Sequence, residues 1–197
     1  MSLVAAAEAG DLDRVQQLLE GGASVQARDD DGRTALTAAS FGNHVEVARV
    51  LIAAGADVNA KDDTVQSPYL IATSEVGDDP RLLEMTLDNG AKVNDKDSYN
   101  GTGLIRAAER GFPRIVRRLL EAGIERDHIN RLSWTALHEA IVLGEGGSRH
   151  VATVRALIDG GVDVNIPDGD GTPPLALAQV RGYTEIADLL RRANARR

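Results

Sequence analysis

Two markers recur along the chain with one shared period. A glycine closes an apolar helical stretch and returns at intervals of 33, 35, 33 and 38 residues, at Gly22, Gly55, Gly90, Gly123 and Gly161. A residue that opens the next small-residue helical stretch returns at the same intervals, at Thr34, Ser67, Thr102, Thr135 and Pro173. Because both markers share the period and its irregularities, the chain is predicted to be a tandem array of one structural unit.

Each unit has the pattern of a turn followed by two helices. The link at 28–33 is rich in Asp and Gly, and the hydroxyl residue after it suits a helix N-cap. Apolar residues then recur at helical spacing, as in Leu36, Ala39, Val47, Val50 and Leu51. The closing glycine supplies the left-handed backbone that ends a helix. A lone helix pair cannot bury its apolar face, so each unit must be stabilised by its neighbours.

The repeated segments resemble the ankyrin repeat over nearly the whole chain. They are RTALTAA (33–39), GTGLIRAA (101–108) and WTALHEA (134–140), with GADVNA (55–60), GAKVN (90–94) and GVDVN (161–165). The resemblance, to a small stand-alone bacterial ankyrin-repeat protein, implies an all-α repeat fold. That fold is a solenoid of helix-turn-helix units with β-turn fingers, and it implies a role in protein–protein interaction.

We predict one ankyrin-repeat domain over residues 1–197 with about six units. The boundaries are 1–30 for an N-terminal cap, then 31–62, 63–97, 98–130 and 131–168, and 169–197 for a C-terminal cap. Two units are longer than the others, around 75–80 and 143–150, and we expect mobile loops there between the two helices of a unit. These loops are either an accessory contact edge or neutral variation.

Composition restricts the classes of function. The chain has no cysteine, which excludes disulfides, thiolate nucleophiles and cysteine zinc sites. Its net charge of −8 repels phosphates, so nucleic acid is not an expected partner. No run approaches the roughly 18 apolar residues of a membrane span. We expect a soluble, cytoplasmic monomer, or a periplasmic or secreted protein if a signal peptide was removed.

No residue pattern points to catalysis, a cofactor or a metal. The four histidines lie in different units, and the resemblance implies that His138 hydrogen-bonds to tie a finger to a helix. The acidic clusters at 29–31, 62–63 and 168–170 lack calcium-loop spacing: a loop begun at Asp168 would place Pro173 where a glycine is needed and Gln179 where a glutamate is needed. We interpret these aspartates as caps of turn amides and predict that the protein is not an enzyme.

The resemblance also implies a binding face, made of finger tips and the solvent side of each first helix. Its positions are Arg33, Phe41, Lys61, Gln66, Lys96, Tyr99, Glu109, Arg110, Ile129, Arg131, Leu132, Trp134, Val142 and Leu143. We predict partner contacts at Phe41, Tyr99, Arg110, Ile129, Arg131, Leu132, Trp134, Val142 and Leu143, where apolar, aromatic and arginine side chains gather.

The predicted partner is an unknown protein or peptide bound on the concave face, with Trp134 and Tyr99 at the centre. Two alternatives stay open. Trp134 could instead cover the adjacent finger. The protein could also be an accessory or stabilising periplasmic ankyrin protein associated with a stress enzyme.

Overall fold

The structure is a computed structural model that describes residues 1–196. The described residues form twelve α-helices and no β-strand, which confirms the all-α repeat class. The helices fall into two compact parts, here called the first unit (Met1–Lys92) and the second unit (Val93–Arg197), and each contains three of the repeated helix pairs. Whether the chain behaves as a single domain stays a prediction.

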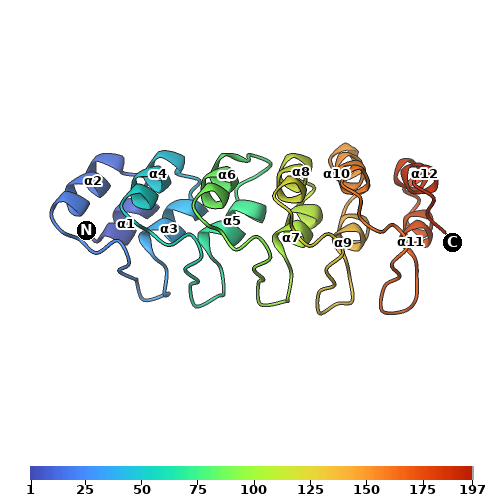
Figure 1. The fold of residues 1–197 in the computed structure, drawn as a ribbon, viewed down its shortest axis with the longest axis horizontal. Coiled ribbons are helices and arrows are strands. Elements are labelled where there is room, and N and C mark those ends of the chain that lie inside the picture. The colour runs from blue at the N-terminus through green and yellow to red at the C-terminus, as the bar shows by residue number, and fades with distance from the viewer. Residues whose placement is uncertain (197) are drawn as a thin grey trace. The chain divides into compact units, whose positions relative to one another are not determined.

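The first unit contains three helix pairs, in which the first helix of each pair is called inner and the second outer (Figure 1). The inner helices pack in a row, α1 on α3 and α3 on α5, and the outer helices α2, α4 and α6 pack in a parallel row. Their bounds are α1 Leu3–Glu8, α2 Leu12–Glu20, α3 Ala35–Phe41, α4 Val45–Ala53, α5 Pro68–Ser74 and α6 Arg81–Asp88. Stacking in two rows buries the apolar helix faces that a single helix pair would leave exposed to solvent.

The second unit repeats this arrangement. Inner helices α7, α9 and α11 pack in sequence, and outer helices α8, α10 and α12 pack beside them. Their bounds are α7 Gly103–Arg110, α8 Pro113–Glu121, α9 Ala136–Val142, α10 Ser148–Asp159, α11 Pro174–Val180 and α12 Thr184–Arg192. Fingers extend beyond the inner helices in both units, so finger tips and inner helices share one side (Figure 1).

Both sequence markers have the predicted local roles. The five opening residues are the N-caps of α3, α5, α7, α9 and α11. The Thr34 and Ser67 side chains accept hydrogen bonds from the backbone N–H groups of Thr37 and Leu70. The five closing glycines all have positive φ, between 80° and 90°.

A side-chain oxygen holds each finger closed. In the first finger the Asp29 Oδ1 atom accepts N–H groups two and four residues later, from Asp31 at 3.1 Å and Arg33 at 2.8 Å. The same pair of bonds recurs at Asp62, Asp97, Asn130 and Asp168. Isolated bridges between residues 28 and 34, and between 96 and 102, close two of the fingers. The interpretation of the acidic clusters as turn caps is confirmed.

A second series of polar side chains ties each repeat to the next within a unit. In the first unit the Asn59 amide donates to the Gly90 carbonyl and accepts from the Lys92 N–H. In the second unit Asn94 and Asp127 accept the backbone N–H groups of Glu125 and Asp163. The bonds of Asn59 and Asn94 explain why an asparagine follows Val in the GADVN-type segments.

The two expansions differ from each other. Residues 75–80 form a connection between α5 and α6, as expected. The predicted loop 143–150 is shorter than expected, because α10 already begins at Ser148 and runs for 12 residues. The remaining connection is also anchored rather than free, since the Tyr183 hydroxyl donates to the Gly144 carbonyl at 2.9 Å.

Gly55 offers a direct test of the repeat marker. Its φ is 90°, and the space that a Cβ atom would occupy has no other atom within 4 Å, so Gly55→Ala adds backbone strain without a clash. We expect the variant to lose about 1 kcal/mol of unfolding free energy. Chemical denaturation followed by circular dichroism measures this loss.

The matched control is Gly21→Ala. Gly21 has a negative φ, and the same register carries Ala54 and Ala122 in other repeats. Its stability should stay within about 0.5 kcal/mol of wild type. Equal losses at Gly21 and Gly55 would contradict the conformational explanation.

Candidate functional site

A pocket of about 180 Å³ lies on the finger and inner-helix side of the second unit, and we call it the finger pocket. Two fingers, α7, α9 and the residue after α9 supply its walls. The lining residues are Asp97, Tyr99, Gly101, Ile105, Arg106, Glu109, Asn130, Leu132, Glu139 and Leu143. The finger caps Asp97 and Asn130 therefore belong both to the scaffold and to the pocket.

Large apolar side chains surround the pocket and reach solvent. Tyr99 is 67 % exposed, Leu132 52 % and Leu143 50 %. Ile129 is 46 % exposed on the same finger as Leu132, although it does not line the pocket. Exposed apolar side chains in one place are typical of a contact surface.

The other predicted contact residues have different surroundings. Trp134 and Val142 are half-buried, so much of each side chain is used for packing. The Arg131 guanidinium donates to the Ser98 carbonyl at 2.7 Å, joining two finger tips. Arg110 is exposed at the end of α7, and Phe41 is exposed in α3 of the first unit. The structure thus brings together Tyr99, Leu132 and Leu143 from the predicted set.

The interior of the pocket is charged, and the charges follow one spacing. The Asp97 Oδ2 atom pairs with the Arg106 guanidinium at 3.0 Å. Nine residues separate these partners, and nine also separate Asn130 from Glu139, where the Asn130 amide donates to Oε1 at 2.7 Å. In adjacent repeats an acid therefore faces a base, and an amide faces an acid.

Glu139 is an acidic residue buried in α9. It is only 4 % exposed, and its Oε2 atom has no hydrogen-bond partner within residues 1–196. Burial raises the pKa of Glu139 to about 7 because it disfavours the charged form, and the negative charge of Glu109 acts in the same direction. The Asn130 hydrogen bond lowers the pKa, and the charge of Asp97 raises it further.

Sequence reasoning placed Glu109 on the binding face but did not single out Arg106, Asn130 or Glu139. Comparing the repeats position by position would have singled out Arg106 and Glu139. Four residues after the opening marker, the other repeats carry Ala38, Ile71 and Leu177, whereas these two carry Arg106 and Glu139. Asn130 is likewise the one amide among the five finger caps. Charge in a register that is otherwise apolar indicates a site that packing alone does not explain.

All four histidines make structural hydrogen bonds. The His44, His128 and His150 rings bond the carbonyls of Glu8, Asn100 and Glu109 at 2.8–3.1 Å. His138 Nδ1 accepts from the Thr135 N–H at 3.1 Å, within the capping box of α9. His138 therefore ties the start of its own helix, and no hydrogen bond from it to a finger occurs in the described chain.

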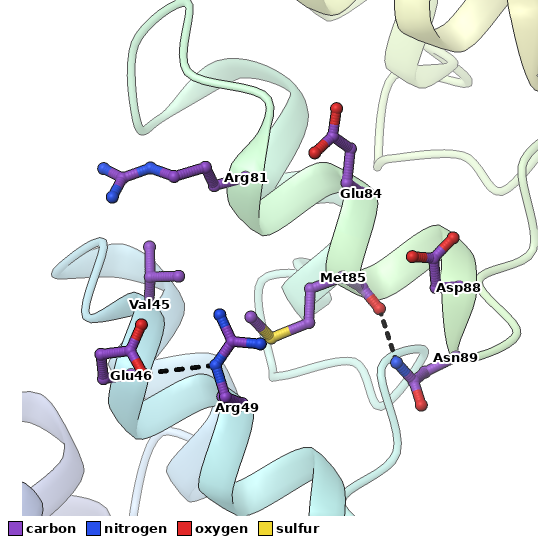
Figure 2. Close-up of a pocket in the computed structure, with 8 residues that line it drawn as sticks. All are labelled: Val45, Glu46, Arg49, Arg81, Glu84, Met85, Asp88 and Asn89. Atoms are coloured by element: carbon purple, nitrogen blue, oxygen red, sulfur yellow. Dashed lines mark hydrogen bonds and ion pairs between the residues drawn. The ribbon is translucent and has the colours of Figure 1, made fainter.

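A second hollow, of about 320 Å³, lies between outer helices α4 and α6 of the first unit (Figure 2). Figure 2 shows Met85 directed toward Arg49, which pairs with Glu46 at 3.2 Å. Arg81, at its edge, pairs with Asp79 at 2.6 Å. Both arginines of this hollow are thus paired with carboxylates, and none of the predicted contact residues lines it.

Residues 1–196 offer neither a metal site nor a membrane span. They contain no group of three or more His, Asp or Glu side chains that could hold a metal ion. None of their helices is long and apolar enough to cross a bilayer.

The chain is similar to ankyrin-repeat proteins in sequence and in structure. The family Ankyrin repeats (3 copies) matches residues 2–62 and 69–168. The ankyrin repeat protein YahD of Escherichia coli (strain K12) is 39 % identical over 96 % of this chain and 94 % of its own length. A crystal structure of an ankyrin repeat domain from Acinetobacter baumannii AYE has a TM-score of 0.91 at 43 % identity and covers 98 % of both chains.

One similar protein is an enzyme. The glycerophosphocholine phosphodiesterase gde1 of Schizosaccharomyces pombe is 33 % identical over 83 % of this chain, but the matched region is only 14 % of gde1. The similarity therefore concerns a small part of that protein.

The Glu139 carboxyl makes stability depend on pH. Its folded-state pKa of about 7 lies above the ordinary 4.5, so the folded chain binds more protons and this group's contribution to stability falls as pH rises between those values. Glu139→Gln keeps an acceptor for Asn130 and removes the titration. Relative to wild type, we expect the variant to gain roughly 1–3 kcal/mol between pH 5 and pH 8.

Denaturation midpoints at several pH values measure the difference. Glu145→Gln, at an exposed residue outside the pocket, is the control and should follow wild type at every pH. A constant offset between Glu139→Gln and wild type would show that Glu139 titrates as it does in water.

Proposed function

Because the chain belongs to the ankyrin-repeat family, we propose that it is a non-enzymatic module that binds another protein through the inner-helix side of its second unit. Ankyrin-repeat proteins are generally protein-interaction modules, and the fold is generally a non-enzymatic scaffold. The fold leaves the partner unspecified, so the choice of surface must rest on particular side chains.

The exposed apolar rim of the finger pocket carries the proposal. Tyr99, Leu132 and Leu143 expose half or more of their surface around one hollow. Burying apolar area of this kind stabilises a complex by about 25 cal/mol per Å² before the costs of association. Two fingers closed by side-chain hydrogen bonds and the end of α9 hold these residues, so little ordering is needed on binding.

The proposed contact surface extends outward from this rim. We include Arg110 and Arg131 in it as exposed polar residues, and Trp134 and Val142 for the parts of their side chains that reach solvent. Its members are Tyr99, Arg110, Ile129, Arg131, Leu132, Trp134, Val142 and Leu143. Phe41 lies in the other unit, and we do not place it on this surface. The proposed partner is a protein or peptide rather than nucleic acid, in keeping with the net charge of −8.

Leu132→Asp tests the surface directly. Leu132 is half-exposed on a finger tip, so the variant should fold normally but replace apolar contact area with a carboxylate that must lose its hydration in the interface. In affinity capture from a lysate of the source cell, we expect a partner retained by wild type to bind at least about tenfold more weakly. Mass spectrometry identifies the partner, and thermal melts verify folding.

Val180→Asp is the matched control, because Val180 is an exposed apolar residue of the same unit outside the pocket. It should capture the same partner as wild type. Trp134→Ala is a weaker test, since Trp134 is half-buried and its loss should also lower stability. If Leu132→Asp and wild type capture the same proteins, the proposed surface is wrong.

A further inference from the structure

The finger pocket contains an acceptor that nothing in the described fold uses. Glu139 Oε1 accepts the Asn130 amide, but Oε2 has no hydrogen-bond partner within residues 1–196 although the side chain is almost wholly buried. A buried carboxylate oxygen without a donor costs free energy that packing must offset. Glu139 also lines the pocket, so this acceptor belongs to a side chain that borders a hollow open to solvent.

The charges of the pocket indicate the sign of that donor. Three carboxylates line it, at Asp97, Glu109 and Glu139, against one guanidinium at Arg106. Arg106 pairs with Asp97, which leaves Glu109 and Glu139 as the carboxylates in excess. A cation placed here gains more than it would at the surface, because the site is partly shielded from water.

The size and rim of the pocket indicate what carries the cation. Its volume of about 180 Å³ is below the roughly 300–1,000 Å³ of sites for drug-sized ligands, and corresponds to a single side chain. Tyr99, Leu132 and Leu143 form an apolar entrance above the acidic interior. Long basic side chains have this same distribution, with an aliphatic stem and a charged end.

We propose that the finger pocket binds a lysine side chain of the protein partner, whose ammonium group donates to Glu139 Oε2 while its stem packs against Tyr99, Leu132 and Leu143. This proposal rests on the proposed function and names the partner chemistry at its centre. Lysine fits better than arginine because a guanidinium favours two parallel acceptors, and Oε1 is already taken by Asn130.

Binding of the ammonium group is linked to protons. Glu139 must be ionised to attract the cation fully, and its raised pKa leaves it largely protonated below neutral pH. The charges that raise its pKa are Glu109 on α7 and Asp97 on the finger, and Arg106 lines the same pocket. Of the other helices packed on α9, α11 has no charged residue, and no group of α10 is among the charges that act on Glu139. Affinity for a lysine side chain should therefore rise between pH 6 and pH 8.

The probe is N-acetyl-lysine methylamide, with the norleucine analogue as its uncharged counterpart. Titrations of the full chain followed by NMR at pH 8 should show saturable shifts around the pocket, with millimolar affinity. We expect binding to weaken at least about tenfold for the norleucine probe and for Glu139→Gln. Glu145→Gln should bind the lysine probe as wild type does, and the rise with pH should vanish in Glu139→Gln.

Several results would overturn the proposal: equal binding of the lysine and norleucine probes, tighter binding of the matching arginine probe, unchanged affinity in Glu139→Gln, or no shifts in wild type. Thermal melts are the check that Glu139→Gln is folded. The lysate capture distinguishes failure of the lysine site from failure of the proposed protein-binding function. If Leu132→Asp loses a partner that Glu139→Gln keeps, the proposed contact surface is supported and the lysine site is wrong.

Discussion

Each finger depends on one side-chain oxygen that accepts two backbone N–H groups, two and four residues further along the chain. The bonds occur at Asp29, Asp62, Asp97, Asn130 and Asp168. They satisfy amides that a tight turn would otherwise leave unpaired, and they fix where the next helix begins. The inner helices start at the same point of every repeat for this reason, and their apolar faces consequently meet.

The fold could be predicted from the sequence because its determinants are local and repeated. A glycine with positive φ and a capping hydroxyl each act within a few residues, so their spacing in the sequence reports the spacing of the helices. The start of α10 was harder to predict. Ser148 lies in a glycine-rich stretch that is typical of a loop, yet Arg149 and His150 bond the end of α7 and hold the extra turn in place.

The candidate site was only partly predictable, because it depends on burial and on contacts between repeats. Tyr99, Leu132 and Leu143 were identified from their positions in the repeat pattern, and they do surround one pocket. Trp134 stood out by residue type, but its burial depends on packing that a pattern does not describe. Glu139 was missed because an acid in an inner helix is usually solvated, whereas here its environment is set by Asn130 and Glu109.

The spacing of nine residues between finger cap and inner helix has a consequence for how such arrays change. The cap needs only one oxygen, so its other terminal atom is available to choose a neighbour. At Asp97 that atom pairs with Arg106, and at Asn130 it donates to Glu139, whereas the other aspartate caps have an apolar residue in the same register. Two substitutions can thus change the net charge of a cap and its helix neighbour from zero to negative, while the cap keeps both of its backbone hydrogen bonds.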